Sequence, residues 1–320
     1  MVPDPTAGMS KGETALYKTG LTLARILQVL PLRRVARLGR FGGLIAWHIA
    51  RRRRRIVLDN LQKCFGAKMA SVEIQDMARE NFCRLGEMFL CLAGTSAMNK
   101  ELLEACMKVD GLDKLCQSEG NDTPPSCVLA IGHFGNYELF ANLGKFLPGW
   151  QCMTSYRSLK QKYLDQLALQ IRSSSGCHFY ERRKEAAILK AAAQRRQVII
   201  GLLADQRVAK GVRLPFLGRA CVATRAPAVF AVRYRVRLFP AICYRIGLAQ
   251  WRIEIGDEIP TFHNGTRRAI DDITLDVNRV FEAAVRRDPV NWFWVHDRWK
   301  GHGEPLCQVS AKTDEASAVP

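Results

Sequence analysis

The sequence predicts an α/β fold in which a mixed, largely parallel sheet is flanked by helices. Two short apolar runs, Cys127–Ile131 and Val198–Ala204, have the length and composition of buried strands. Segments with apolar residues at helical spacing lie between and around such runs. Strands that alternate with helices are typical of parallel sheets, because a parallel pair needs a crossover connection.

The first 55 residues are expected to form a basic amphipathic segment that precedes the main domain. Between residues 13 and 50, apolar side chains recur three and four positions apart, with arginines between them. Pro31 is expected to divide this stretch into two helices, because proline lacks the N–H that a continuous helix requires. Basic amphipathic helices of this kind can lie in the interfacial plane of a membrane.

Residues 56–305 are expected to form the main domain, with a disordered tail over residues 306–320. Its first part, residues 56–120, shows apolar residues at helical spacing. Further strands are expected at 151–156, 238–244 and 252–255, and helices at 134–147, 159–172, 184–194 and 270–286. An aromatic cluster at 291–300 ends the domain, and we interpret its tryptophans as core residues.

The charge of the chain is strongly basic and unevenly distributed. Lys and Arg number 48 against 30 Asp and Glu, which gives a formal net charge of +18. Residues 1–60 hold 12 basic and three acidic residues, so half of the net charge lies there. Such an excess attracts polyanions, and each basic residue near an anionic leaflet contributes about 1 kcal/mol to membrane binding. The run Arg51–Arg55 therefore favours attachment to an anionic lipid surface.

The apolar stretches are too short to predict a membrane-spanning helix. None reaches the ~18 residues that a spanning helix needs. The first 18 residues also lack the basic and apolar regions of a secretory signal. Peripheral or monotopic attachment is therefore expected.

The chain contains 11 cysteines, and none of them lies at a short metal-ligand spacing from another. We expect reduced thiols that are packed as small apolar side chains. Neither a metal nor a cofactor is expected.

One segment, Gly132–Glu138 (GHFGNYE), brings a base and a carboxylate to the end of the first predicted strand. Open α/β sheets bind their ligands at the carboxyl ends of the strands, where His133 is expected. The imidazole of His133 can take a proton from an attacking hydroxyl, and the carboxylate of Glu138 can hold the ring in the correct tautomer. Backbone N–H groups at the helix start, near Gly135 and Asn136, can support the turn and stabilise an oxyanion. We therefore interpret His133 and Glu138 as a catalytic pair that meets at the sheet edge.

The segment His133–Glu138 resembles the H-F-G-N-W-E motif of the bacterial lipid A biosynthesis (late) acyltransferases, a family of the lysophospholipid acyltransferase superfamily. Tyr137 stands where that motif usually has tryptophan. Other segments within residues 50–300 are similar to the family: RRRRRIVLDNLQKCF at 51–65, RENFCRLG at 79–86, Tyr156-Arg157, Arg172 with Gly176, Asp205-Gln206, PFLG at 215–218 and WFWVHDRWK at 292–300. Each segment is short, but their combination is specific.

The resemblance implies a glycerol-3-phosphate acyltransferase-like fold and an O-acyltransferase activity. It further implies an acyl-carrier-protein thioester as donor and a phosphorylated glucosamine lipid of the Kdo-lipid IVA type as acceptor. The expected location is the cytoplasmic face of the inner membrane. An acidic carrier protein and an anionic membrane surface are the partners that a basic protein would attract.

The resemblance also implies substrate-binding roles for residues near the predicted strand ends. Arg157, Arg172 and Arg207 are expected to bind phosphates of the acceptor, since arginine pairs well with phosphate oxygens. Asp205 is expected to bind an acceptor sugar or to orient Arg157, with Gln206 supporting it by a hydrogen bond.

Three other functions remain open from the sequence. An enzyme of the same superfamily can act on another acceptor, such as a mannosylated phosphatidylinositol or an amino-acid lipid. A relative without activity would only bind lipid. A nucleic-acid-binding protein would explain the charge, but the sequence shows no motif for it.

Overall fold

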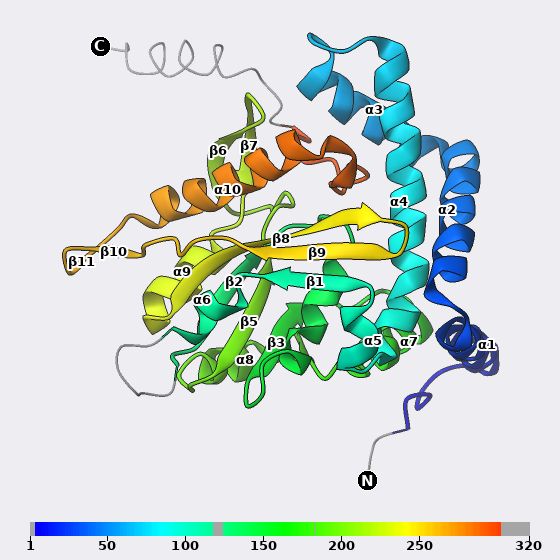
Figure 1. Cartoon of the computed structure of the whole chain (residues 1–320), viewed down its shortest axis with the longest axis horizontal. Coiled ribbons are helices and arrows are strands. Elements are labelled where there is room, and N and C mark those ends of the chain that lie inside the picture. The colour runs from blue at the N-terminus through cyan, green and yellow to red at the C-terminus, as the bar shows by residue number, and fades with distance from the viewer. Residues whose placement is uncertain (1–3, 118–123, 183, 302–320) are drawn as a thin grey trace.

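The structure is a computed structural model that describes residues 4–117, 124–182 and 184–301. A seven-stranded sheet with the order β1-β9-β8-β2-β5-β3-β4 forms its centre (Figure 1). These strands are β1 (Met107–Asp110), β2 (Cys127–Ile131), β3 (Gln151–Tyr156), β4 (His178–Glu181), β5 (Val198–Leu203), β8 (Arg237–Gly247) and β9 (Gln250–Ile255). Two small hairpins, β6 (Val212–Phe216) with β7 (Arg219–Ala223) and β10 (Phe262–His263) with β11 (Thr266–Arg267), lie outside it.

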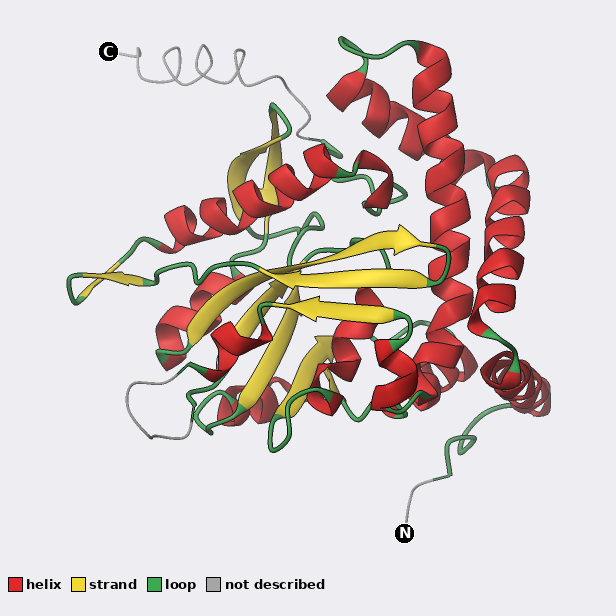
Figure 2. Cartoon of the chain, in the orientation of Figure 1, coloured by secondary structure: helices red, strands yellow, loops and turns green. Residues whose placement is uncertain are grey.

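Five neighbouring strands, β8, β2, β5, β3 and β4, run parallel to one another. Strand β9 is antiparallel to β8, and β1 is parallel to β9. The predicted mixed, largely parallel sheet is therefore confirmed. Helices lie along both sides of it, as the red ribbons in Figure 2 show.

The helices are α1 (Lys11–Val29), α2 (Leu32–Ile49), α3 (Arg51–Phe65), α4 (Ser71–Ala97), α5 (Lys100–Glu104), α6 (Leu112–Cys116), α7 (Lys162–Ser173), α8 (Ala186–Ala192), α9 (Ala226–Tyr234) and α10 (Ile270–Arg287). The described residues also form two 3₁₀ helices, η1 (Tyr137–Lys145) and η2 (Pro289–Asn291). Among the described residues, no helix is both long and apolar enough to cross a membrane.

The central strand β2 is buried on both faces, as its continuous apolar run predicts. Val128 and Ala130 pack into one hydrophobic core, while Cys127, Leu129 and Ile131 pack into the other. Successive side chains point to opposite faces of a strand, so β2 contributes to both cores. The end of β2 is consequently a rigid position for the residues that follow it.

The N-terminal helices pack along α4. Pro31 is the N-cap of α2, so the predicted division at this proline is confirmed. Helix α2 lies so close to α4 that a Cβ atom on Gly39 or Gly43 would collide with the α4 backbone at Gly86 or Phe82. Residue 55, where the sequence suggested the end of a separate segment, lies inside α3.

Several elements differ from the sequence expectations. Residues 56–120 are mainly helical, as predicted, but the pattern did not predict the short strand β1 among them. The helix predicted over 134–147 is the 3₁₀ helix η1, which begins only at Tyr137. The strands β1 and β4 are four residues long, too short for a periodic pattern. The predicted tail over 306–320 lies outside the described residues.

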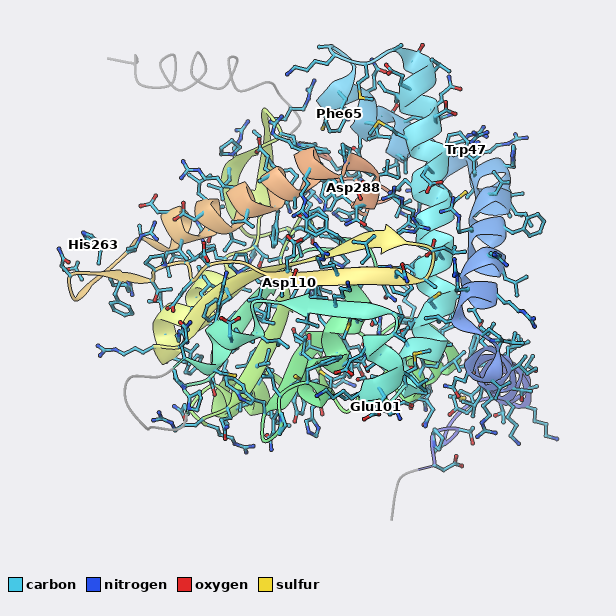
Figure 3. All side chains as sticks on the ribbon, in the orientation of Figure 1. Trp47, Phe65, Glu101, Asp110, His263 and Asp288 are labelled. Atoms are coloured by element: carbon cyan, nitrogen blue, oxygen red, sulfur yellow. The ribbon has the colours of Figure 1, made fainter. Side chains whose placement is uncertain are left out.

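The carboxyl ends of the parallel strands face α4 and the segment that follows α10. In Figure 1, the arrowhead of β8 ends beside α4, and the orange segment after α10 lies close to it. Figure 3 labels three side chains in this region, Trp47, Phe65 and Asp288. Trp47 packs edge-on against Phe82 of α4, Phe65 packs against Trp294, and Asp288 is bonded to Arg84 of α4. Helices α3 and α4 therefore pack on the C-terminal segment at this edge, and α2 packs on α4.

Candidate active site

The register between β2 and β5 places His133 beside Asp205. Ile131 pairs with Leu203, so the residues two positions beyond them, His133 and Asp205, leave neighbouring strands at the same level. The backbone N–H of His133 donates to Asp205 Oδ2 at 2.8 Å. The ring atom His133 Nδ1 lies 2.6 Å from Asp205 Oδ1. One carboxylate thus holds both the backbone and the ring of His133.

Asp205 is buried and ionised. Burial raises the pKa of this carboxyl, but the His133 charge and the hydrogen bonds from the His133 ring, the Trp292 indole and the His133 N–H outweigh it and lower the pKa to about 2. The indole Nε1–H of Trp292 donates to Asp205 Oδ2 at 2.7 Å. Because an ionised carboxylate only accepts hydrogen bonds, Nδ1 of His133 carries a proton, and in the neutral imidazole the lone pair is then on Nε2. An imidazole in this tautomer is a general base.

Aromatic rings surround the His133 imidazole. The Tyr137 ring lies edge-on to it at 4.6 Å between centroids, and the Phe293 ring lies at 5.6 Å. Burial raises the pKa of the Tyr137 hydroxyl. The His133 side chain is nevertheless 11% exposed, so the ring is partly accessible. An apolar surround of this kind strengthens electrostatic interactions with the ring.

Glu138 is bonded to Arg172 and not to His133. Arg172 Nε donates to Glu138 Oε2 at 2.9 Å and Nη2 donates to Oε1 at 2.5 Å, which is a bidentate pair. Burial opposes the charge of Arg172, but the Glu138 carboxylate outweighs it and the pKa of Arg172 is raised. The expected direct contact between His133 and Glu138 is therefore absent from the structure. The physical reason is that Glu138 enters η1 facing α7, while the strand register gives His133 the nearer carboxylate, Asp205.

Gly135 and Asn136 support the turn between β2 and η1. Gly135 has a φ of +50°, and a Cβ atom there would lie 2.6 Å from the carbonyl oxygen of Cys243. Its N–H donates to the carbonyl of Asn291 at 2.9 Å, so that group is not free to bind an oxyanion. Asn136 is fully buried, and neither polar atom of its side chain has a hydrogen-bond partner in the described part of the chain. The geometry assigns Gly135 to the turn and not to an oxyanion hole.

The remaining predicted site residues lie near this edge but differ in how exposed and how hydrogen-bonded they are. Arg157 directly follows β3 and is exposed. Arg207 is partly buried, and its backbone N–H donates to His296 Nε2 at 3.0 Å. Among the described residues, no hydrogen bond joins Gln206 to Asp205. Asp205 is fully buried, so it neither reaches a sugar nor orients Arg157, in contrast to the sequence expectation.

A model of the family described as bacterial lipid A biosynthesis acyltransferase matches residues 9–301. The chain belongs to this family. The match covers nearly the whole chain, so it includes the N-terminal helices as well as the sheet. A comparison with individual curated proteins gave no match.

Membership in this family makes the chain an acyltransferase, as the resemblance of its motifs implied. In this chain the segment 292–298 (WFWVHDR) lies beside His133, because the Phe293 ring packs against the His133 imidazole. Trp292, Trp294 and Trp299 are buried, which confirms their interpretation as core residues. Phe134 forms an isolated bridge with Trp292, so this segment pairs with the turn that carries His133.

The sequence does not predict two features of this candidate site. Asp205 was named, but its partnership with His133 depends on a strand register that no local pattern reveals. Trp292 was interpreted as a core residue only, yet its indole also fixes Asp205. The sequence signal is that His133 and Asp205 each follow closely on an apolar run, Cys127–Ile131 and Val198–Ala204 respectively.

Proposed function

We propose that this lipid A biosynthesis acyltransferase transfers a fatty acyl chain from an acyl-carrier-protein thioester to a hydroxyl of a Kdo-lipid IVA type precursor. The reaction would take place at the cytoplasmic face of the inner membrane. The observation that carries the proposal is the 2.6 Å contact between His133 Nδ1 and the ionised Asp205. This contact leaves Nε2 as a base at the carboxyl edge of the sheet.

The chemistry follows from that base. His133 Nε2 takes the proton of the acceptor hydroxyl while the hydroxyl oxygen attacks the thioester carbonyl carbon. The carbon–sulfur bond of the tetrahedral intermediate then breaks, and the departing thiolate takes the proton from the imidazolium. The products are an ester and a free thiol on the carrier. Asp205 stays ionised throughout and stabilises the imidazolium, so it acts as a positioning residue.

Glu138 is proposed as the second catalytic residue. It contacts the acceptor and not the imidazole of His133. Arg172 holds both of its oxygens from one side, and each oxygen retains a lone pair that can accept a bond from a sugar hydroxyl. Its side chain is 8% exposed, so the approach is narrow. The polar part of the acceptor is proposed to bind to Arg157, Gln206 and Arg207.

The proposed donor is a protein, and the charge of this chain supports that choice. Acyl carrier proteins are acidic, and a net charge of +18 speeds their diffusional encounter with this enzyme. The same charge attracts nucleic acid. Measuring the binding of nucleic acid and of the acyl carrier protein separately at physiological salt distinguishes the two partners.

The proposed membrane contact is a stripe of exposed apolar residues on α2. Leu38, Phe41, Ile45 and Ile49 are all exposed. At ~100° per residue they fall within an arc of about 80° on the helix. The opposite face of α2, with Gly39 and Gly43, packs on α4. A stripe of this kind beside the arginines of α2 fits the headgroup boundary of an anionic leaflet.

Transfer with purified protein tests the proposed function. The assay combines acyl-carrier-protein thioesters with a Kdo-lipid IVA type acceptor and follows the acylated product by mass spectrometry. We expect product with the wild type and a loss of at least 10³-fold with His133→Ala. A deletion strain should lack one secondary acyl chain on its lipid A. An unchanged lipid A, or transfer only to a mannosylated phosphatidylinositol or an amino-acid lipid, would reject the proposed acceptor.

A further inference from the structure

The segment 290–296 ends η2 and then continues outside the helices and strands. Three of its residues, Asn291, Trp292 and Trp294, are nevertheless buried. A buried backbone that belongs to no helix or sheet must bond its carbonyl groups to other donors, because an unpaired buried carbonyl costs free energy. The donors that satisfy these carbonyls therefore fix the position of the segment.

A buried asparagine of α4 bonds the first half of this segment. Asn81 Nδ2 donates to the carbonyls of Val290 and Trp292, at 2.8 and 2.7 Å. The amide oxygen of Asn81 has no hydrogen-bond partner in the described part of the chain. The reversed amide would turn that oxygen toward both carbonyls, and an amide oxygen only accepts hydrogen bonds. The NH₂ group is therefore the part of this side chain that holds the segment.

A buried asparagine of α3 bonds the second half in the same way. Asn60 Nδ2 donates to the carbonyls of Trp294 and His296, at 3.0 Å each. Arg53 of the same helix donates to the carbonyl of Val295 between them, at 3.1 Å. In Figure 1, α3 and α4 lie beside the orange segment that follows α10. The two helices thus hold the segment at successive carbonyls.

The bonds from Asn81 reach the groups that orient the active-site base. Trp292 accepts from Asn81 at its carbonyl and donates from its indole to Asp205 Oδ2. Asn291, between the two carbonyls that Asn81 bonds, accepts the N–H of Gly135 in the turn after β2. A shift of the segment would therefore displace a partner of the carboxylate and a support of the turn together.

The bonds from Asn60 reach the other side of the same site. Phe293, which packs its ring against the His133 imidazole, directly precedes the first carbonyl that Asn60 bonds. His296 carries the last of these carbonyls, and its Nε2 accepts the backbone N–H of Arg207. Both ends of this stretch therefore contact residues at the edge where the base lies.

We propose that Asn60 and Asn81 are positioning residues of the acyl transfer. They hold residues 290–296 at the place in which the Trp292 indole bonds Asp205, and neither asparagine touches a substrate in this role. A misplacement of about 1 Å at a reacting group can lower a rate by roughly 10²-fold, so bonds of this kind affect kcat. The effect on kcat rests on the proposed function, whereas the bond between Trp292 and Asp205 can be observed without substrate.

The test compares Asn81→Ala with a matched control, Ser126→Ala. Ser126 is also buried, and its hydroxyl also makes two bonds to backbone, to the carbonyl of Arg195 and the N–H of Val198. It directly precedes β2, at the end of that strand opposite to His133. Each variant removes two buried hydrogen bonds, so the control shows what a loss of stability alone does to the site.

Proton NMR of protein with ¹⁵N-labelled tryptophan follows the bond between Trp292 and Asp205 without substrate. The Trp292 indole signal is assigned by its absence from Trp292→Phe. A strong bond to a carboxylate moves the indole proton downfield and protects it from exchange with water. We expect an upfield shift and roughly tenfold faster exchange in Asn81→Ala, and the wild-type signal in Ser126→Ala. A wild-type signal in Asn81→Ala, or the same change in both variants, would overturn the proposal.

Transfer kinetics measure the consequence for the reaction. We expect Asn81→Ala to lower kcat roughly ten- to hundredfold while KM stays within a few-fold of wild type. Ser126→Ala should keep both constants. Combined with Trp292→Phe, Asn81→Ala should lower kcat by less than the product of the two single losses, because Asn81 acts through Trp292. A loss equal to that product, or an unchanged kcat in Asn81→Ala, would contradict the assigned role.

Asn60→Ala keeps the test decisive if Asn81→Ala does not fold. It should lower kcat by roughly tenfold and speed the exchange of the Trp292 indole proton, since it releases the same segment from α3. Wild-type kcat and exchange in this variant would also overturn the proposal. If the wild type transfers no acyl chain, the proposed function fails, and the NMR comparison still decides whether the asparagines hold Trp292 against Asp205.

Discussion

His133 and Asp205 are bonded to each other twice, once through the backbone N–H and once through the ring. The N–H reaches Oδ2 at 2.8 Å and Nδ1 lies 2.6 Å from Oδ1. The Trp292 indole shares Oδ2 at 2.7 Å. Since Oδ2 receives two N–H donors, the carboxylate cannot rotate, and it presents Oδ1 to the ring in one orientation. The tautomer of His133 is thus decided by three residues from three segments.

Replacing Asp205 with Asn should reverse that tautomer. The amide oxygen must occupy the Oδ2 position, because the N–H groups of His133 and Trp292 both donate there. The NH₂ group then faces Nδ1, which becomes an acceptor, and the proton moves to Nε2. We expect kcat to fall by about 10³- to 10⁴-fold, measured in the transfer assay.

The same variant has a readout that a general loss of structure would not produce. Nitrogen NMR of ¹⁵N-imidazole-labelled protein should show the proton on Nδ1 in the wild type and on Nε2 in Asp205→Asn. The melting temperature of the variant should remain close to that of the wild type. Transfer activity within tenfold of wild type would contradict the role assigned to Asp205.

Glu138 and Arg172 should be energetically coupled. Their bidentate contact is buried on the Glu138 side, while Arg172 is about a quarter exposed. Allowing for that exposure, Glu138→Ala and Arg172→Ala should each destabilise the fold by about 1–3 kcal/mol. The double variant should lose less stability than the two single variants lose together, since the second change removes a charge that is already unpaired. Urea unfolding of the four proteins measures this, and additive losses would show that the pair is not coupled.

Phe41 should contribute to membrane binding. It is 61% exposed in the apolar stripe of α2, and Leu102 on α5 is exposed to a similar extent, 57%, away from that stripe. Phe41→Asp should weaken sedimentation with phosphatidylglycerol vesicles by about tenfold or more, because transfer of such a side chain out of water is worth about 1.5–3 kcal/mol. Leu102→Asp serves as the control. Equal binding of the two variants would place the membrane contact on another surface.

Two neighbouring glycines of α2 should respond in opposite directions to alanine. A Cβ atom on Gly42 meets no other atom within 4 Å, whereas one on Gly43 collides with the α4 backbone at Phe82 and Cys83. Gly42→Ala should stabilise the protein by about 0.5–1 kcal/mol, since alanine loses less backbone entropy in a helix. Gly43→Ala should destabilise it by about 1–3 kcal/mol. Thermal unfolding checks both, and similar shifts would refute the close α2–α4 contact.

His296 should make stability depend on pH between about 6.5 and 4. Burial lowers the pKa of this imidazole to about 4, and its Nε2 accepts the N–H of Arg207. The unfolded chain therefore binds more protons than the folded one in this range, so stability falls as pH decreases. After allowance for partial exposure, the loss should be about 1–2 kcal/mol.

His296→Gln supplies the control for this pH effect, because an amide oxygen can still accept the Arg207 N–H but does not titrate. Urea unfolding at a series of pH values should show the slope between pH 6.5 and 4 in the wild type and a smaller slope in the variant. Asp205 affects stability in a lower pH range. Because the pKa of its carboxyl is lowered in the folded protein, the stability that it contributes is lost only as pH falls below about 4. Identical slopes in the two proteins would exclude His296 as the source.

Local pattern was enough to predict much of this protein. The apolar runs of β2 and β5 and the helical spacing in α10 are properties of consecutive residues, so the sequence alone specified them. It also specified that His133 stands at the end of a buried strand, the position at which α/β sheets bind ligands. Pro31 alone predicted where the N-terminal helices divide, and α2 begins directly after it.

Tertiary structure alone decided which carboxylate serves His133. Glu138 is five residues away along the chain and Asp205 is 72 residues away, yet the β2–β5 register brings the distant one into contact. Register depends on how two strands pair across the whole sheet, and no local pattern encodes it. The same holds for the arginines of α3. The sequence determined their charge, but only the packing of α3 on residues 294–296 decided that Arg53 bonds to the carbonyl of Val295 while Arg51 and Arg55 stay exposed.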